Sequence, residues 1–271
     1  ITGLVEWPNA IMGQIDPDFM ALPPEVLVTS MRVHQKFFAL SETGTADQLA
    51  PYFMTVANRK ADPDHDQLIA AGNERVLRAR LSDAKFFYQQ DRKSPLAENT
   101  GRLAAITFYE GLGTVAQKAE RMAALAGAMA RYSDTADPDL ARRAAYLAKA
   151  DLVTDMVGEF PELQGIMGGY YAASSGEHDD VAAAIAEHYR PQGPSDAIPA
   201  GLYGQLVSLA DKLDTLTGFF GIGAKPTGSR DPFALRRAAL GVLRILDEAD
   251  LALPVDAVLA DAAALHGADG H

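Results

Sequence analysis

Short apolar runs with strand-like composition occupy the first 58 residues of the chain. These runs are rich in β-branched and aromatic side chains, and they are Leu4–Trp7, Val26–Val28, Phe37–Leu40 and Tyr52–Val56. Such runs are typical of strands, so they predict a small sheet. Thr43-Gly44 is a turn signal between two of them. Pro23-Pro24 before Glu25 leaves a short helix open as the alternative for the second run.

From residue 62 onward, apolar residues recur at the three-to-four spacing of a helix face. Asp62-Pro63 is a helix-start signal, Gly72-Asn73 predicts a break, and Thr114 with Gln117 fits a capping box. Helices are expected at 114–131, 138–157, 179–189, 201–217, 231–248 and 254–266. The predicted fold class is α+β, with a small N-terminal mixed α/β part followed by a mostly α-helical domain.

Length, charge and cysteine content exclude several classes of protein. The chain has 271 residues, a net charge of −12 and no cysteine. A length above that of one typical domain favours two domains, or one elaborate domain. The charge excludes a uniformly basic nucleic-acid-binding surface, and the absence of cysteine excludes disulfides, zinc–thiolate sites and cysteine nucleophiles. No apolar run is long enough for a membrane helix, and no signal peptide is apparent. Because the chain opens at Ile1 rather than Met, we expect an excised or processed piece.

The negative charge is unevenly distributed. Residues 72–121 hold nine Lys or Arg against six Asp or Glu, and residues 217–244 hold five Lys or Arg against one Asp. Between them, residues 133–200 hold four basic and twelve acidic residues. Local basic surfaces are therefore compatible with the negative net charge of the chain.

Common catalytic motifs are missing from the sequence. It contains no GxSxG elbow, no GxxxxGK[ST] phosphate loop and no HExxH frame. The glycine-rich stretch Gly218–Gly228 includes Lys225, and we interpret it as a helix end followed by a mobile loop; a basic loop that contacts a nucleic-acid backbone is the alternative. His178-Asp179 is interpreted as part of a helix start rather than a metal site.

Two aspartates lie on apolar helix stripes, where a lone charge would be costly. Asp151 follows the stripe of Leu140, Ala144 and Leu147, and Asp211 lies within the apolar segment Leu206–Leu213. A buried carboxylate needs a partner. The sequence leaves two interpretations open, a metal or catalytic site and a structural ion pair with Lys or Arg.

Six distinctive stretches follow one another along nearly the whole chain: Gly3–Pro8, Asn73–Ala84, Asp91–Lys93, Leu112–Thr114, Phe219–Gly223 and Asp231–Arg244. Together they resemble the β subunit of bacterial heterotetrameric glycyl-tRNA synthetase. Relative to that family, the chain looks like an internal segment without the N-terminal part and the anticodon-binding part. The resemblance implies residues 1–98 as the end of an N-terminal region, and residues 99–271 as a helical HD-like domain truncated at its C-terminus.

The resemblance also implies a function. Such enzymes join glycine to tRNA-Gly with ATP, and the aminoacylation site, with its ATP and Mg²⁺, lies in the α subunit. The expected partners are therefore tRNA-Gly and the α subunit, in the cytoplasm and without a membrane. For this segment we expect no catalytic residue, no metal and no cofactor of its own.

HD hydrolases hold metal through a His, a His-Asp doublet and a distant Asp. The resemblance places Lys118, Ala150-Asp151 and Asp211 at those positions, so both histidine positions are lost. Two carboxylates without imidazole are poor ligands for a transition metal. Our hypothesis is that the Lys118 ammonium pairs with Asp151 or Asp211 in place of the metal.

Candidate tRNA-binding residues are the basic side chains of the two basic segments, where arginine favours bidentate phosphate contacts. They are Arg75, Arg78, Arg80, Arg92, Lys93, Lys225, Arg236 and Arg237. For the first five, surface ion pairs with Glu74, Asp83 and Asp91 are the alternative. Two other functions also stay open: a metal-dependent HD-type phosphohydrolase acting on nucleotides or RNA ends, and a pure module for assembly with the α subunit.

Overall fold

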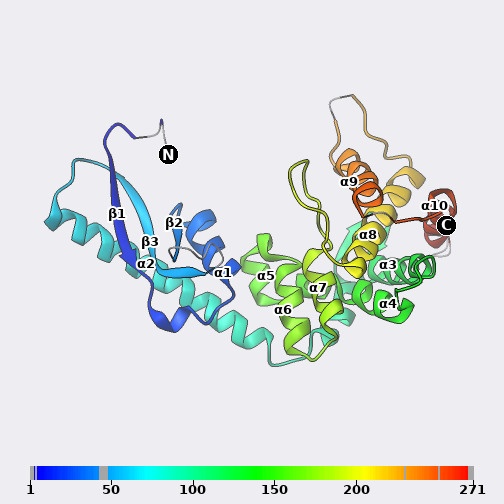
Figure 1. The fold of residues 1–271 in the computed structure, drawn as a ribbon, viewed down its shortest axis with the longest axis horizontal. Helices are drawn as coiled ribbons and strands as arrows, with labels where there is room; N and C mark the ends of the chain where they lie inside the picture. Colours follow the sequence, from blue (N-terminus) through cyan, green and yellow to red (C-terminus); the bar gives the residue numbers. More distant parts are fainter. Residues whose placement is uncertain (1–2, 4, 43–47, 229, 250, 268–271) are drawn as a thin grey trace. The chain divides into compact units, whose positions relative to one another are not determined.

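A computed structural model describes residues 3, 5–42, 48–228, 230–249 and 251–267, which form two compact units. The first unit comprises Ile1–Asp91 with Glu159–Leu163, and the second comprises Arg92–Gly158 with Gln164–His271. Strands come first and helices dominate afterwards, which confirms the α+β class (Figure 1). None of the described helices is both long and apolar enough to cross a bilayer.

The first unit contains a three-stranded antiparallel sheet in the order β1-β3-β2. Its strands are β1 (Pro8–Gln14), β2 (Phe38–Ser41) and β3 (Leu49–Asn58). Ile11 pairs with Thr55 and Gly13 with Phe53, so Ile11 and Phe53 share one face of the sheet. Both side chains are buried, whereas Met12 on the opposite face is 60% exposed. One face of the sheet therefore packs into the core of this unit.

The long helix α2 (Pro63–Asp91) covers the sheet and packs against β1. It buries Leu77, Leu81 and Ala84, and the side chain of Asn9 on β1 donates a hydrogen bond to Asp66 at 2.8 Å. The predicted break at Gly72-Asn73 is wrong, since α2 continues through both residues. A glycine inside a helix costs about 1 kcal/mol relative to alanine. The packing of the next two turns on the core offsets that cost.

The structure confirms some of the strands predicted from the short apolar runs and contradicts others. Val26–Val28 lies in helix α1 (Pro24–Thr29), so the helical alternative opened by the two prolines is correct and the strand is wrong. The strand expected near Leu4–Trp7 begins only at Pro8. The turn signal Thr43-Gly44 lies outside the described residues. The remaining elements are short helices: η1 (Pro17–Phe19), η2 (Ser30–His34) and η5 (Pro161–Leu163).

The second unit is a helical assembly around α8 (Leu202–Gly221), which packs against several other helices of the described residues. These are α3 (Val115–Ala130), α4 (Pro138–Leu147), α7 (Asp179–Glu187), α9 (Leu235–Glu248) and α10 (Val255–Gly267). The capping box at Thr114 and Gln117 is confirmed at the start of α3. Before it come η3 (Leu96–Ala105) and a small hairpin of β4 (Thr107–Tyr109) and β5 (Gly113–Thr114).

The helix expected over 138–157 is interrupted. The chain instead forms α4, then η4 (Ala150–Val153) and α5 (Asp155–Glu159). Beyond these, α6 (Ile166–Ser174) packs closely on α7 at Gly169, where an added Cβ would lie 2.7 Å from the Cβ of Ala186. α4 packs against α8, and the interruption after α4 places Lys149 beside Asp211.

Candidate functional site

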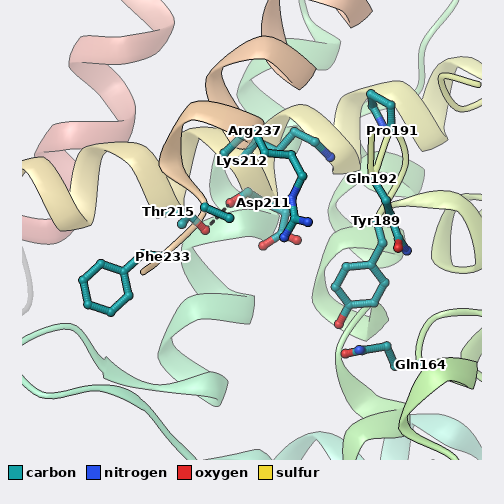
Figure 2. A pocket seen from close by; sticks show the side chains of 11 residues that line it. Gln164, Tyr189, Pro191, Gln192, Asp211, Lys212, Thr215, Phe233 and Arg237 are labelled. Carbon is teal, nitrogen blue, oxygen red and sulfur yellow. Dashed lines mark hydrogen bonds between the residues drawn. The ribbon is translucent and has the colours of Figure 1, made fainter. Parts of the chain in front are cut away.

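Asp211, near the middle of α8, is bound by two lysines inside the second unit. Lys118 on α3 lies 2.9 Å from Oδ1 of Asp211, and Lys149, just before η4, lies 2.8 Å from Oδ2. Both lysine side chains are about 95% buried. One of the two pairings proposed for Lys118 is therefore present, the one with Asp211. Figure 2 shows Asp211 at a cavity of this unit.

A second carboxylate on α8 extends the ionic cluster by one helical turn. Asp214 accepts hydrogen bonds from Arg121 Nε at 2.6 Å and from Lys118 Nζ at 3.0 Å. Asp211 and Asp214 are three residues apart on α8, and Lys118 and Arg121 are three residues apart on α3. Because residues at this spacing share a helix face, two acidic groups of α8 meet two basic groups of α3.

The cations keep both carboxylates ionised. Burial alone would raise the pKa of Asp211, but the charges of Lys118 and Lys149 hold that pKa well below its usual value. The pKa of Asp214 is also lowered, because Lys118, His266 and Arg121 outweigh the effect of its burial. Buried cations and ionised carboxylates thus balance each other in the interior.

His188 lies against this cluster and is neutral. Its Nδ1 donates to the backbone oxygen of Ile185 at 2.6 Å, so Nε2 is the atom that accepts a hydrogen bond from Lys149 at 2.9 Å. Burial and the charge of Lys149 hold the pKa of His188 well below its ordinary value. The imidazole therefore serves as an acceptor for the lysine that binds Asp211.

Asp151 has a different environment. Its Oδ2 accepts hydrogen bonds from the backbone N–H groups of Gly165 at 2.6 Å and Gly168 at 3.1 Å, while Oδ1 has no partner. Complete burial raises its pKa to about 6. Lys118 pairs with Asp211 and Asp214 instead, so the proposed alternative pairing with Asp151 is not the one that the structure has.

The donor set does not fit a divalent cation of the HD type. Both oxygens of Asp211 already bind ammonium groups, and Nε2 of His188 accepts from Lys149. Across the described ranges, no three His, Cys, Asp or Glu side chains are grouped so as to hold a metal ion. Metal ligands must offer free lone pairs, and here lysines use them.

A cavity of about 270 Å³ opens beside Asp211. Figure 2 shows the side chains of Asp211, Lys212 and Arg237 close together on one side of it, and those of Tyr189 and Gln164 on another. Lys212 donates to the backbone oxygen of Arg190 at 2.8 Å and to Ser208 at 2.6 Å. Burial, with the charges of Lys149 and Lys118, lowers the pKa of Lys212 to about 8 although Asp211 opposes it. Arg237, predicted from sequence as a tRNA contact, thus lies at the same cavity as Asp211.

The predicted basic residues of the first unit lie on the exposed side of α2. Arg75, Arg78 and Arg80 are all exposed. Arg78 has a loose ion pair with Asp16 at 3.8 Å, and Arg80 pairs with Glu159 at 3.2 Å. Neither pair uses the sequence neighbours Glu74 and Asp83 that we offered as alternative partners.

The other predicted basic residues belong to the second unit, where all five are exposed. Arg92 and Lys93 directly follow the end of α2. Lys225 lies in the segment after α8, and Arg236 and Arg237 lie in the first turn of α9. The side chain of Asp231 accepts hydrogen bonds from the backbone N–H groups of Leu235 and Arg236, at 2.8 and 2.9 Å. This cap explains why the helix begins four residues after the predicted start.

Sequence reasoning missed several members of the ionic cluster. Lys149, Asp214, Arg121, Lys212 and His188 were not singled out, although each is buried. For Arg121 and Asp214, the sequence contained a usable signal. The spacing of Lys118 and Arg121 on one helix matches the spacing of Asp211 and Asp214 on another, which indicates two facing charge pairs.

Comparisons with known proteins identify the family to which the chain belongs. The family model described as "Glycyl-tRNA synthetase beta subunit" matches residues 1–269. The glycine–tRNA ligase β subunit of Phenylobacterium zucineum is 54% identical over 263 residues, which is 96% of this chain and 39% of that protein. The corresponding protein of Rhodospirillum centenum is 57% identical over 250 residues, covering 92% of this chain and 35% of the relative.

The chain therefore spans well under half the length of the relatives that it matches. The match to the family covers almost every residue of the chain, and the motifs noted above lie within it. On this evidence, the chain belongs to the glycyl-tRNA synthetase β-subunit family.

Proposed function

We propose that this chain is a segment of a glycine–tRNA ligase β subunit that binds and positions the acceptor end of tRNA-Gly and supports assembly with the α subunit. In this proposal the chain carries no aminoacylation site, and ATP, Mg²⁺ and glycine are handled by the α subunit. The support for it is family membership, the names of the relatives and the basic surface described above. A degenerate HD-like core, with Lys118 and Lys149 bound to Asp211, is part of the same proposal.

The observation that carries the proposal is the arginine pair on α2. Arg75 and Arg78 lie three residues apart on this helix, and both side chains are exposed. Among the described residues Arg75 has no ion-pair partner, and the pair of Arg78 with Asp16 is 3.8 Å long. Guanidinium groups that are exposed and loosely paired are available for phosphate oxygens. On a chain with a net charge of −12, such local groups are needed to bind RNA.

The experiment is fluorescence-anisotropy binding of the 271-residue chain to an acceptor minihelix of tRNA-Gly over a salt series. We expect saturable binding that weakens with salt, because phosphate contacts release counterions. Replacing both Arg75 and Arg78 with Ala should weaken binding and reduce the salt slope by about one for each lost contact. The matched control is Arg32→Ala, another exposed arginine of the first unit. Binding that is insensitive to salt, or equal in the double variant and the control, would overturn the proposal.

Assembly is tested separately, by co-purification of the α subunit with the same variants. Loss of minihelix binding with retained α-subunit pairing supports a role of Arg75 and Arg78 in RNA binding. Loss of pairing with unchanged minihelix binding would instead show that these arginines make protein contacts.

A further inference from the structure

Around the cavity beside Asp211, the buried basic side chains outnumber the buried carboxylates. Lys118, Arg121, Lys149 and Lys212 are buried together with Asp211, Asp214 and Asp151, and Asp151, which is ionised above pH 6, interacts with the charge of Lys149. One positive charge is therefore in formal excess. Arg237 adds another at the cavity wall. An excess of buried cations is unfavourable unless an anion compensates it.

Of the four buried cations, Lys212 is the one whose ammonium makes no ion pair with any of the described residues. Its ammonium donates only to a backbone oxygen and a hydroxyl, those of Arg190 and Ser208. An ammonium has three N–H donors, so one remains for a ligand in the cavity that Lys212 lines. Burial is the main cause of the lowered pKa of Lys212, and it outweighs the opposing charge of Asp211.

Four other polar side chains of the cavity wall are also free of hydrogen bonds to the described residues, whereas the hydroxyl of Thr215 is engaged by Lys118 and Asp211. Within the described part of the chain, the side chains of Arg237, Gln164, Gln192 and Tyr189 make no hydrogen bond or ion pair, although all four line the cavity. Both oxygens of Asp211 are taken by lysines, so this carboxylate offers little to a cationic ligand. The unused groups are therefore mostly hydrogen-bond donors, as recognition of an anion requires.

A second cavity of about 520 Å³ adjoins the first, and the two share Pro191, Gln192 and Arg237. Its other lining residues are mostly apolar: Gly193, Pro194, Leu240, Gly241 and the stem of Arg244. The guanidinium of Arg244 is held by Glu248 and by backbone oxygens of Gly193 and Asp196. A polar cavity and an apolar one thus meet at Arg237, which suits a ligand with one anionic end and one apolar end.

We propose that these two cavities form a binding site for a phosphate monoester the size of a mononucleotide, with its phosphate against Lys212 and Arg237 and its ring against Pro191 and Leu240. The phosphate supplies the anion that Lys212 lacks, and the fork of Arg237 suits its oxygens. The ring fills the apolar cavity, where small ligands typically bury their flat parts. The site is separate from the arginines of α2 and does not depend on their binding to RNA.

The test is isothermal titration of the 271-residue chain with AMP, adenosine and inorganic phosphate as probes. AMP should bind in a 1:1 ratio, and adenosine about tenfold more weakly, since it lacks the charge-assisted hydrogen bonds. Arg237→Ala should weaken AMP about tenfold and leave adenosine unchanged. The matched control is Arg131→Ala, an exposed arginine of the same unit away from both cavities. Equal affinities for AMP and adenosine, or equal behaviour of the two variants, would overturn the proposal.

Two further readouts test each end of the ligand. Leu240→Ser, at a residue that is 59% exposed, should weaken AMP and adenosine but not phosphate. At pH 8, AMP binding should take up protons, because an anion against Lys212 raises the pKa of this group from about 8. Titrations in buffers with different ionisation enthalpies measure that uptake. Unchanged AMP binding by Leu240→Ser, or no proton uptake, would contradict the assigned pose.

Competition with the acceptor minihelix identifies the natural source of the phosphate. Displacement of AMP by the minihelix indicates that the site receives the end of an RNA, and simultaneous binding indicates a free nucleotide. Either result requires that AMP binds. Minihelix binding without AMP binding would refute this site while leaving the proposed function intact.

Discussion

Lys149 Nζ lies 2.8 Å from Asp211 Oδ2, and this pair connects the end of the α4 segment to the middle of α8. The same carboxylate binds Lys118 of α3 at 2.9 Å, so one aspartate joins three parts of the second unit. All three side chains are at least 87% buried. Because all three charged groups are largely withdrawn from water, each member of the set depends on the others.

Asp211→Asn should therefore destabilise the chain strongly. Two buried ammonium groups would lose their counter-charge, and breaking a buried pair in this way costs about 3–5 kcal/mol. The control is Asp139→Asn, which removes an exposed partner of Arg142 and should cost less than about 1 kcal/mol. Urea unfolding followed by circular dichroism measures both variants. Equal losses of stability would contradict the role given to the buried pair.

The pKa of Asp151 predicts a pH dependence of stability. Its folded pKa of about 6 lies above the ordinary value of 3.8, so the folded chain binds this proton more tightly than the unfolded chain. The cost of burying the charged form is complete above pH 6 and is relieved as the pH falls toward 4. Its full size is on the order of 2–3 kcal/mol.

Asp151→Asn removes this titration. The melting temperature of the unmodified chain should rise relative to that of the variant as the pH is lowered from 7.5 to 5. Asp211 and Asp214 titrate below this window, because their pKa values are lowered, so they do not contribute to the difference. A constant difference between the two melting curves over this pH range would show that Asp151 keeps an ordinary pKa.

Asp231→Ala should fray the start of α9. Its carboxylate caps two backbone N–H groups, and loss of such a cap costs about 1 kcal/mol. Hydrogen exchange at Leu235 and Arg236 should speed up, while exchange in α3 stays the same. Because Arg237 lies in that first turn, AMP affinity should also fall. Unchanged exchange at both amides would mean that the helix start is fixed by other contacts.

Gly169→Ala should destabilise the contact between α6 and α7. The new methyl group would lie 2.7 Å from the Cβ of Ala186 and 3.0 Å from the backbone oxygen of Ala182, so the helices would have to separate. Overpacking of this kind costs about 1–3 kcal/mol. Gly158→Ala in α5 is the control, since nothing lies near its added Cβ, and it should be neutral or stabilising. Thermal unfolding distinguishes the two, and equal effects would argue against close packing at Gly169.

The sequence predicted the elements whose signals are local. The capping box at Thr114 and the helix start at Asp62-Pro63 are read from neighbouring residues, and both are present in the structure. The short run Val26–Val28 contained too few residues to distinguish a strand from a helix. Gly72 was misread because the packing that carries α2 through it comes from residues distant in the sequence.

The site was predictable only in part for the same reason. Lys118 and Asp211 were found through a family resemblance, and their contact follows from the packing of α3 on α8. Lys149, flanked by alanines, gave no signal, because its inward position depends on the interruption after Leu147. The cavity walls at Tyr189, Pro191 and Gln192 belong to an irregular segment, where no periodicity indicates which side chains turn inward.

The binding of Asp211 by two lysines also constrains how the family can change over generations. A substitution at Asp211 leaves two buried ammonium groups without a counter-charge, and a substitution at either lysine leaves Asp211 with one ammonium group instead of two. A single substitution within this trio destabilises the protein. The residues at positions Lys118, Lys149 and Asp211 should therefore be retained together or replaced together. Aligned sequences of the family should therefore contain the complete trio or a wholly uncharged substitute, with mixed combinations rare.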